Sequence, residues 1–215
     1  MTEFTDRWQM NRDKENVPSK LKDAMNPPGD LRKKLVDTDR SLTSQISKLD
    51  KTVTKMTEKE KVLFNKTTVA FQKHDTTMAH AYANELSEHR KAMKLVQSAR
   101  LCLEQVQMRL KTITDFGDLA NVLAPAGQVV RTVRTSLQKV MPSANDTLSE
   151  ISTGLQGMML DIGSVPGMSM SFESNGEEAE KILAEASVVA ETKMASSLPD
   201  IPEAALNNTD SNSSI

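Results

Sequence analysis

Apolar residues recur at helical spacing from Leu31 to Ile113. In the first half of this segment they stand seven residues apart, and Ile46 and Val53 add a second apolar position beside the series. In the second half the intervals are three and four residues. A period near 3.5 puts such residues on one side of a helix, which must pack against another helix to be shielded from water. The two series are Leu35, Leu42, Leu49, Met56, Leu63 and Ala70, followed by Tyr82, Leu86, His89, Met93, Val96, Ala99, Leu103, Val106, Leu110 and Ile113.

No proline or glycine interrupts this segment. At about 1.5 Å per residue, each half would form a helix on the order of 60 Å long. We expect the chain to reverse at Lys73–Asp75, where the apolar series weakens and Asp75 can cap a helix that begins at Thr76. Asp30 is similarly placed to cap the first helix. One unbroken helix is the alternative, because the expected turn contains neither glycine nor proline.

Shorter apolar patterns follow the predicted hairpin. We expect one helix over Leu119–Ala124, ended by Pro125, and another over Gln128–Val140. Asn145–Leu160 and Glu177–Ser196 are amphipathic as well. The sequence therefore predicts an all-α fold, in which a long antiparallel helical hairpin is followed by shorter C-terminal helices and the termini are flexible.

Prolines, glycines and changes in charge divide the chain into five expected parts. The first is an N-terminal amphipathic segment and linker, and the second is the helical core. A linker, an acidic helix with a proline-containing motif, and a disordered tail follow. Their expected boundaries are 1–29, 30–160, 161–176, 177–202 and 203–215.

Composition favours narrow seams between helices over a thick globular core, because only 3% of residues are aromatic and 38% are hydrophobic. The single cysteine and the charged residues within Met1–Met10 favour a reducing cytoplasmic compartment over secretion. The sequence contains no phosphate-binding glycine loop, metal-ligand spacing or motif-placed nucleophile. We therefore expect neither an enzyme nor a cofactor or metal site, and interpret His89 and Cys102 as packing residues.

Charge is distributed unevenly: residues 1–140 carry a net charge of +8 and residues 141–215 a net charge of −10. Three cations stand in the first turn of the first predicted helix, where the helix dipole disfavours them. We therefore expect this arm to bind anionic membrane lipids, with Phe4 and Trp8 as an interfacial anchor. We also expect the acidic tail to compete for the basic rod that the two arms form. The cations expected on this surface are Arg32, Lys33, Lys34, Arg40, Lys48, Lys51 and Lys55.

Other interpretations remain open at this point. Trp8 is also compatible with a frayed end or with a contact to a neighbouring subunit. A soluble coiled-coil adaptor without membrane activity would use the same hairpin, although it would not need cations in the first turn. A basic face also suits nucleic-acid packaging, but no aromatic residues alternate with the cations, and we expect no nucleic acid partner.

Several short runs carry a family resemblance, namely His74–Thr77, Tyr82–Glu85, Leu103–Val106 with Arg109 and Leu110, Asp115–Asp118, Ala124–Pro125 and Ile182–Ala186. Over roughly residues 20–202 the chain resembles the archaeal branch of the ESCRT-III family, the cell-division B proteins. The resemblance implies a subunit that polymerises, with itself and with paralogous subunits, on the inner face of the cell membrane at the division site. It further implies constriction or scission in archaeal cell division, with an acidic tail that restrains assembly in a closed state.

The resemblance also implies disassembly by an AAA ATPase whose microtubule-interacting-and-transport (MIT) domain grips the tail. Ala186 and Ser187 occupy the middle of the helical ATPase-binding pattern and weaken that match, whereas Leu198–Pro202 is similar to the family's extended proline motif. Longer relatives carry a C-terminal winged-helix segment, for which the residues after Pro202 are too few. The residues expected to contact the ATPase are Ile182, Leu183, Leu198, Pro199, Ile201 and Pro202.

Overall fold

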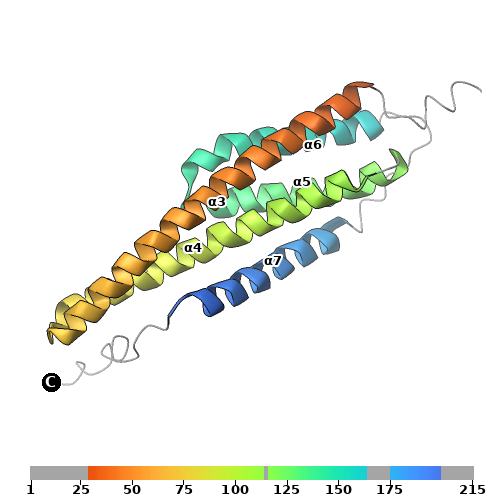
Figure 1. Ribbon diagram of the computed structural model, residues 1–215. Coiled ribbons are helices and arrows are strands. Elements are labelled where there is room, and N and C mark those ends of the chain that lie inside the picture. The colour runs from red at the N-terminus through yellow and green to blue at the C-terminus, as the bar shows by residue number, and fades with distance from the viewer. Residues whose placement is uncertain (1–28, 114–115, 164–174, 200–215) are drawn as a thin grey trace, which may run out of the picture.

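The computed structural model describes residues 29–113, 116–163 and 175–199, and all regular structure within these ranges is helical. Two long helices form an antiparallel hairpin, and shorter helices lie against it (Figure 1). The predicted all-α fold is therefore confirmed. The elements are α3 (Gly29–Gln72), α4 (Thr76–Lys111), α5 (Phe116–Leu137), the 3-10 helix η2 (Pro142–Ala144), α6 (Asn145–Gly163) and α7 (Asn175–Ser197).

The hairpin reverses at the predicted position, between Gln72 and Thr76. His74 adopts a left-handed backbone conformation with φ 56°, which turns the chain back on itself. The Asp75 carboxylate then accepts a hydrogen bond of 3.0 Å from the backbone N–H of Met78, so it caps α4 as expected. The alternative of one unbroken helix is wrong. A side-chain cap and one residue in the left-handed region replace the glycine that a tight turn commonly uses.

The seam between α3 and α4 contains the predicted apolar residues. His89 is half-buried there, and its Nε2 lies 2.8 Å from the carbonyl oxygen of Met56, so it is a hydrogen-bonded seam residue. Burying each large apolar side chain contributes roughly 1.5–3 kcal/mol relative to exposure. Residues of the two series that become buried are Leu42, Leu49, Leu63, Ala70, Leu86, Met93, Val96, Ala99, Leu103, Val106 and Leu110.

The prediction for residues 119–140 is wrong, because α5 is one helix that contains Pro125. A proline in a helix interior loses one backbone hydrogen bond and costs about 3 kcal/mol. Here Leu123, Ala126 and Val129 are all buried around a buried Pro125, and packing on both sides of the proline offsets that cost. Tertiary burial thus overrides the local signal. The helix instead ends at Leu137, whose carbonyl accepts hydrogen bonds from two following backbone N–H groups.

Other helix boundaries differ slightly from expectation, and α7 spans Asn175–Ser197 where we expected Glu177–Ser196. Helix α3 begins at Gly29, so Asp30 lies inside the first turn and not before it as a cap. A shift of one or two residues is ordinary at helix ends, because the last turns of a helix fray. Helix α6 continues to Gly163, whereas we expected its end at Leu160.

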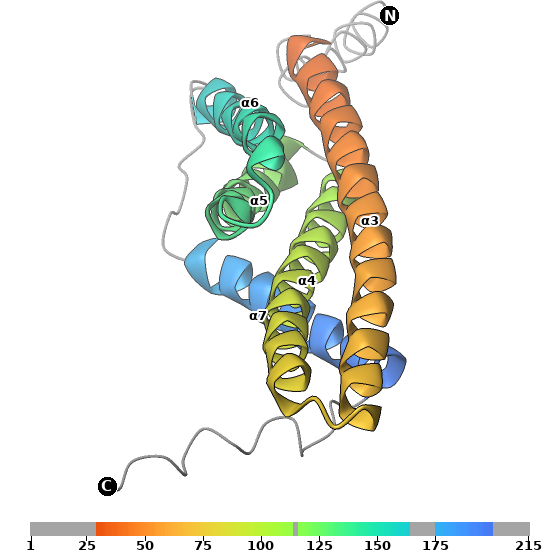
Figure 2. The ribbon, with the colours of Figure 1, turned by 90° about the vertical axis from the view of Figure 1, so that its left-hand side faces the viewer.

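The shorter helices cover the hairpin unequally. Helices α5 and α6 pack on the half of the hairpin that lies away from its turn, and α7 crosses α4 on another side (Figures 1 and 2). Leu119, Leu148, Leu155 and Ile182 join this part of the hairpin in one continuous core. The half nearest the turn has fewer helices around it and keeps three exposed apolar side chains: Val62, Val69 and Met78.

Polar residues lie where α3 meets α6. The Thr38 hydroxyl packs so closely against Gly154 that a Cβ there would lie 3.1 Å from it. Two helical turns further along α3, Gln45 is fully buried, and neither its amide nitrogen nor its amide oxygen has a hydrogen-bond partner. An unpaired buried polar group costs roughly 1–3 kcal/mol. The burial of Gln45 therefore lowers the stability that the packing around this part of α3 provides.

Candidate functional site

Six of the seven cations predicted to bind lipid are exposed on α3, and their side chains make no hydrogen bond or ion pair within the described residues. Five of them succeed one another at intervals of seven, eight, three and four residues, which puts them on one side of the helix. Asp37 is the only acid on that side between the first and the last of them. We call this set the cationic strip: Lys33, Arg40, Lys48, Lys51 and Lys55. Arg32 is also exposed, beside the strip.

Lys34 differs from the other predicted lipid-binding cations. Its ammonium lies 2.8 Å from the carboxylate of Asp161 near the end of α6, and both side chains are partly exposed. An exposed pair of this kind contributes about 0–1 kcal/mol. Lys34 thus helps to hold α6 against α3. The predicted membrane anchors Phe4 and Trp8 lie outside the described residues.

The acidic helix α7 packs on the second arm of the hairpin. The Arg109 guanidinium on α4 pairs with Glu178 near the start of α7. Further along, the Lys94 ammonium lies 3.1 Å from the carboxylate of Glu191. We expected the acidic tail to compete for the basic rod that the two arms form, and these two contacts lie on the second arm of that rod. Apolar residues on α7 direct it onto α4 and α5, and its acids then pair with the cations they find there.

Helix α7 has a small apolar contact face. Its buried residues are Ala179, Ile182, Ala186 and Ala190, so only one large side chain anchors it. Leu183 is half-buried against the same core. Alanine buries little apolar area, and burial free energy scales with area. The docking of α7 is therefore weak for a helix of 23 residues.

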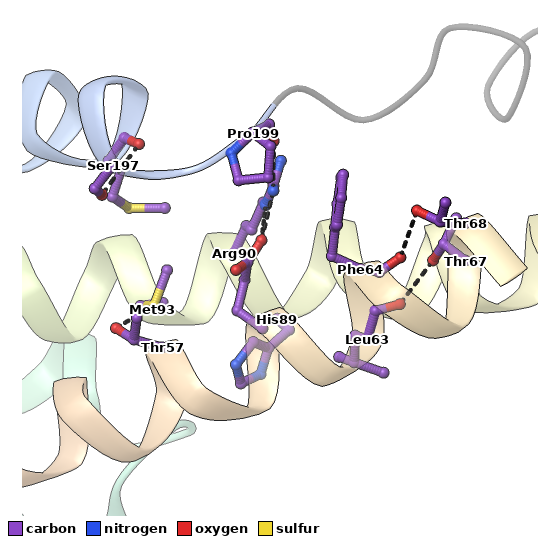
Figure 3. A network of polar contacts seen from close by, with 12 residues as sticks. Thr57, Leu63, Phe64, Thr67, Thr68, His89, Arg90, Met93, Ser197 and Pro199 are labelled. Carbon is purple, nitrogen blue, oxygen red and sulfur yellow. Dashed lines mark hydrogen bonds and ion pairs between the residues drawn. The ribbon is translucent and has the colours of Figure 1, made fainter.

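A single arginine joins the hairpin to the end of α7. Arg90 on α4 contacts one carboxylate oxygen of Glu60 on α3, with its Nη2 at 2.5 Å and its Nε at 3.1 Å. The same Nη2 donates to the carbonyl oxygen of Pro199 at 2.7 Å, as Figure 3 shows. Glu60 is fully buried, and its other carboxylate oxygen has no partner. We call this arrangement the Arg90 clasp.

The sequence carried a signal for the clasp that we did not use. The apolar position of Ile46 and Val53 recurs seven residues later at Glu60 and again at Thr67, and both are buried. An acid at a seam position needs a cation, and Arg90 follows the seam residue His89 on the other arm. No pattern in the sequence indicated the contact of Arg90 with Pro199, because this contact depends on where α7 packs and ends.

The residues predicted to contact an ATPase are distributed over two environments. Ile182 is buried under α7 and is accessible only if this helix moves away. Leu198 is half-buried and Pro199 is exposed, at the end of the described chain. Ile201 and Pro202 lie outside the described residues.

Within the described residues, the one cysteine is buried in the packed core, and no arrangement for binding a metal is present. Cys102 is buried in the core, and burial raises the pKa of its thiol to about 11, although a hydrogen bond with Ser98 acts in the opposite direction. The described ranges hold no group of three or more His, Cys, Asp and Glu residues arranged to bind a metal. None of the described helices has the length and apolar character needed to cross a bilayer.

A long hairpin with shorter helices folded against it is an all-α ESCRT-III-like fold. The chain is 37% identical to cell division protein B1 of Sulfolobus acidocaldarius over 204 residues, which are 95% of this chain and 92% of the relative. It is 26% identical to cell division protein B of the same organism over 172 residues, which are 80% of this chain and 66% of that relative. No family model and no solved structure matches it.

The chain belongs to the cell division protein B family. This family and the helical architecture indicate a structural role in cell division.

Proposed function

We propose that the protein is a filament subunit that assembles on the inner face of the cell membrane at the division site and drives constriction and scission. The observation that carries this proposal is the cationic strip. Within the described residues it is a row of cations without an ion pair on the outer side of α3, while two acids of α7, Glu178 and Glu191, pair with α4. A closed subunit therefore already presents a positive surface.

The dimensions of the strip suit a flat anionic surface. From Lys33 to Lys55 it spans roughly 33 Å at about 1.5 Å per residue. Each Lys or Arg held near an anionic leaflet contributes about 1 kcal/mol. One subunit would therefore bind a membrane weakly and reversibly, and a filament of many subunits would bind it firmly.

Assembly requires a change in the shorter helices. Helix α7 is anchored mainly by Ile182, and the buried amide of Gln45 on α3 has no hydrogen-bond partner among the described residues. When these helices leave, the hairpin becomes available for side-by-side contacts with copies of itself and with paralogous subunits. Two relatives with different names in one organism support paralogous partners.

The tail would then recruit the disassembly machinery. Leu198–Pro202 is the segment proposed to enter the MIT domain of an AAA ATPase. In the closed chain the Arg90 clasp holds the carbonyl of Pro199. Release of this contact would free both the segment and the end of α7.

Vesicle flotation tests the proposal. Full-length protein is floated with phosphatidylglycerol-containing vesicles and with pure phosphatidylcholine vesicles. The test variant is Lys48→Glu/Lys51→Glu/Lys55→Glu on the strip, and the control with the same net charge is Lys139→Glu/Lys181→Glu/Lys193→Glu, where all three lysines are exposed elsewhere. Loss of three contacts of about 1 kcal/mol each predicts roughly 100-fold weaker binding for the strip variant alone.

Electron microscopy of the same samples reports assembly. Filaments on anionic vesicles are expected for the native chain and the control variant, and bare vesicles for the strip variant. Equal loss of binding in both variants would show a general charge effect. Failure of the native chain to bind at low salt would support a coiled-coil adaptor that does not use lipid.

A further inference from the structure

An apolar groove lies beside the turn of the hairpin and is not occupied by any described helix. It has a volume of about 450 Å³ and is formed by α3, α4 and the turn between them. Val62, Val69 and Met78 line it, with 53%, 45% and 45% of their surface exposed. Exposed apolar side chains that gather at one place mark a binding surface more often than scattered ones do. We call it the tip groove.

The rim of the tip groove is positive. Lys66 lies over the ring of Tyr82, with its ammonium 5.6 Å from the ring centre, and both residues line the groove. Lys73 lines it as well and is exposed at the turn. Asp75, the only acid of the lining, is committed to capping α4. An occupant with apolar side chains and carboxylates would match this surface.

The described chain ends next to this groove. Leu198 and Pro199 line a second, smaller depression together with Glu60, Phe64 and Asn65 of α3. Asn65 also lines the tip groove, so the two depressions meet at this residue. From Asn65 to Gln72, where α3 ends beside Lys73, the distance along the helix is roughly 11 Å, at about 1.5 Å per residue.

The residues that follow Pro199 have the required length and chemistry. Asp200–Leu206 contains two carboxylates, at Asp200 and Glu203, and apolar residues that include Ile201 and Leu206. Seven extended residues reach roughly 23 Å, at about 3.3 Å each. A tethered segment also has a high effective concentration, on the order of millimolar for a short linker. It therefore has an advantage over the same segment of another copy.

We propose that Asp200–Leu206 occupies the tip groove of its own chain, with its apolar side chains on Val62, Val69 and Met78 and its carboxylates near Lys66 and Lys73. This binding covers the apolar end of the hairpin. It also hides Ile201 and Pro202, two of the residues expected to contact an ATPase. The proposal concerns a single closed chain, so it stands or falls independently of lipid binding and filament formation.

Disulfide cross-linking of the full-length chain tests the proposal. Val69→Cys/Ile201→Cys is made in a Cys102→Ala background, so that only the introduced thiols react. We expect an intramolecular disulfide, seen as a faster-migrating monomer without reductant, to form at a rate independent of protein concentration. The matched control is Val36→Cys/Ile201→Cys, because Val36 is equally exposed but lies at the other end of α3. Its intramolecular cross-link should form at least 10-fold more slowly.

Two results would overturn the proposal. Equal rates for the two cysteine pairs would show that the segment has no preferred position. Disulfide-linked dimers whose rate rises with concentration would assign the groove to a second copy. An independent measurement is the rate at which a maleimide modifies a lone Val69→Cys. This rate should be several times higher in a chain that ends at Pro199 than in the full-length chain. Unchanged labelling would contradict occupancy.

Discussion

The Nη2 of Arg90 lies 2.7 Å from the carbonyl oxygen of Pro199, so the second arm of the hairpin directly holds the chain that leaves α7. Because the same guanidinium pairs with Glu60, one side chain connects α3, α4 and the residues after α7. The stability of the hairpin and the position of the tail thus both depend on the side chain of Arg90.

Replacement of this arginine should destabilise the hairpin. In Arg90→Met the buried Glu60 carboxylate loses its cation, and breaking a buried ion pair in this way costs about 3–5 kcal/mol. We expect the free energy of unfolding in urea to fall by that amount at neutral pH. A loss below about 1 kcal/mol would indicate that the pair is hydrated in solution.

The double variant Glu60→Leu/Arg90→Met separates the two roles of the clasp. Replacing both partners by apolar residues of similar volume is often neutral or stabilising, so the free energy of unfolding should recover. The contact with Pro199 remains lost. Exchange of the Leu198 amide, which donates to Met194, should therefore be faster in both variants. Recovery of slow exchange in the double variant would argue against a role of Arg90 in holding the tail.

Removal of the large anchor of α7 should detach this helix. Ile182→Ala deletes buried methyl groups, a change that costs about 2–5 kcal/mol in a packed site. We expect fast amide exchange throughout α7 and unchanged protection in α3 and α4. Val188→Ala is the control, since Val188 is 63% exposed on the same helix. Under the proposed function, Ile182→Ala should also assemble at lower protein concentration.

The buried amide of Gln45 predicts a stabilising substitution. Gln45→Met keeps a similar shape and removes two unpaired polar atoms, and we expect a gain of about 1–3 kcal/mol. The control is Gln156→Met at an exposed position, which should change stability by less than about 0.5 kcal/mol. If Gln45→Met is destabilising, the amide has partners in solution, such as bound water. A more stable closed form should also assemble more slowly.

The Cys102 thiol predicts a stability change at alkaline pH. Its pKa is raised by burial to about 11 in the folded chain, from an ordinary value of 9.0. Between these values the folded state holds the proton and the unfolded state releases it, so stability falls as pH rises. The limiting slope is about 1.4 kcal/mol per pH unit. Cys102→Ala should reduce this slope when urea titrations are compared at successive pH values, whatever its effect at neutral pH.

Local signals in the sequence predicted the hairpin well. The turn at Lys73–Asp75 follows from one capping residue and a gap in the apolar series, and both are properties of neighbouring residues. His89 and Cys102 were interpreted as packing residues for the same reason, and the structure confirms this. Such features need no knowledge of which distant segment will pack on them.

Features that depend on distant partners were missed. Pro125 reads as a helix stop because its own backbone disfavours a helix, and only burial against the other helices reverses that preference. The direction of α7 is likewise set by where Ile182 finds a hydrophobic contact, so net charge alone could not tell which arm of the hairpin the acids meet. Opposite net charges indicate that two segments attract each other, but they do not determine which face of the hairpin α7 contacts.

The placement of α7 on the second arm has a consequence for the order of events at a bilayer. Under the proposed function a subunit would bind a leaflet while α7 is still packed on α4, because none of the described helices covers the outward row of lysines and arginines on α3. Adsorption and polymerisation would then be separate steps, and local crowding on the lipid, and not an initial unfolding in solution, would set where the first filament grows.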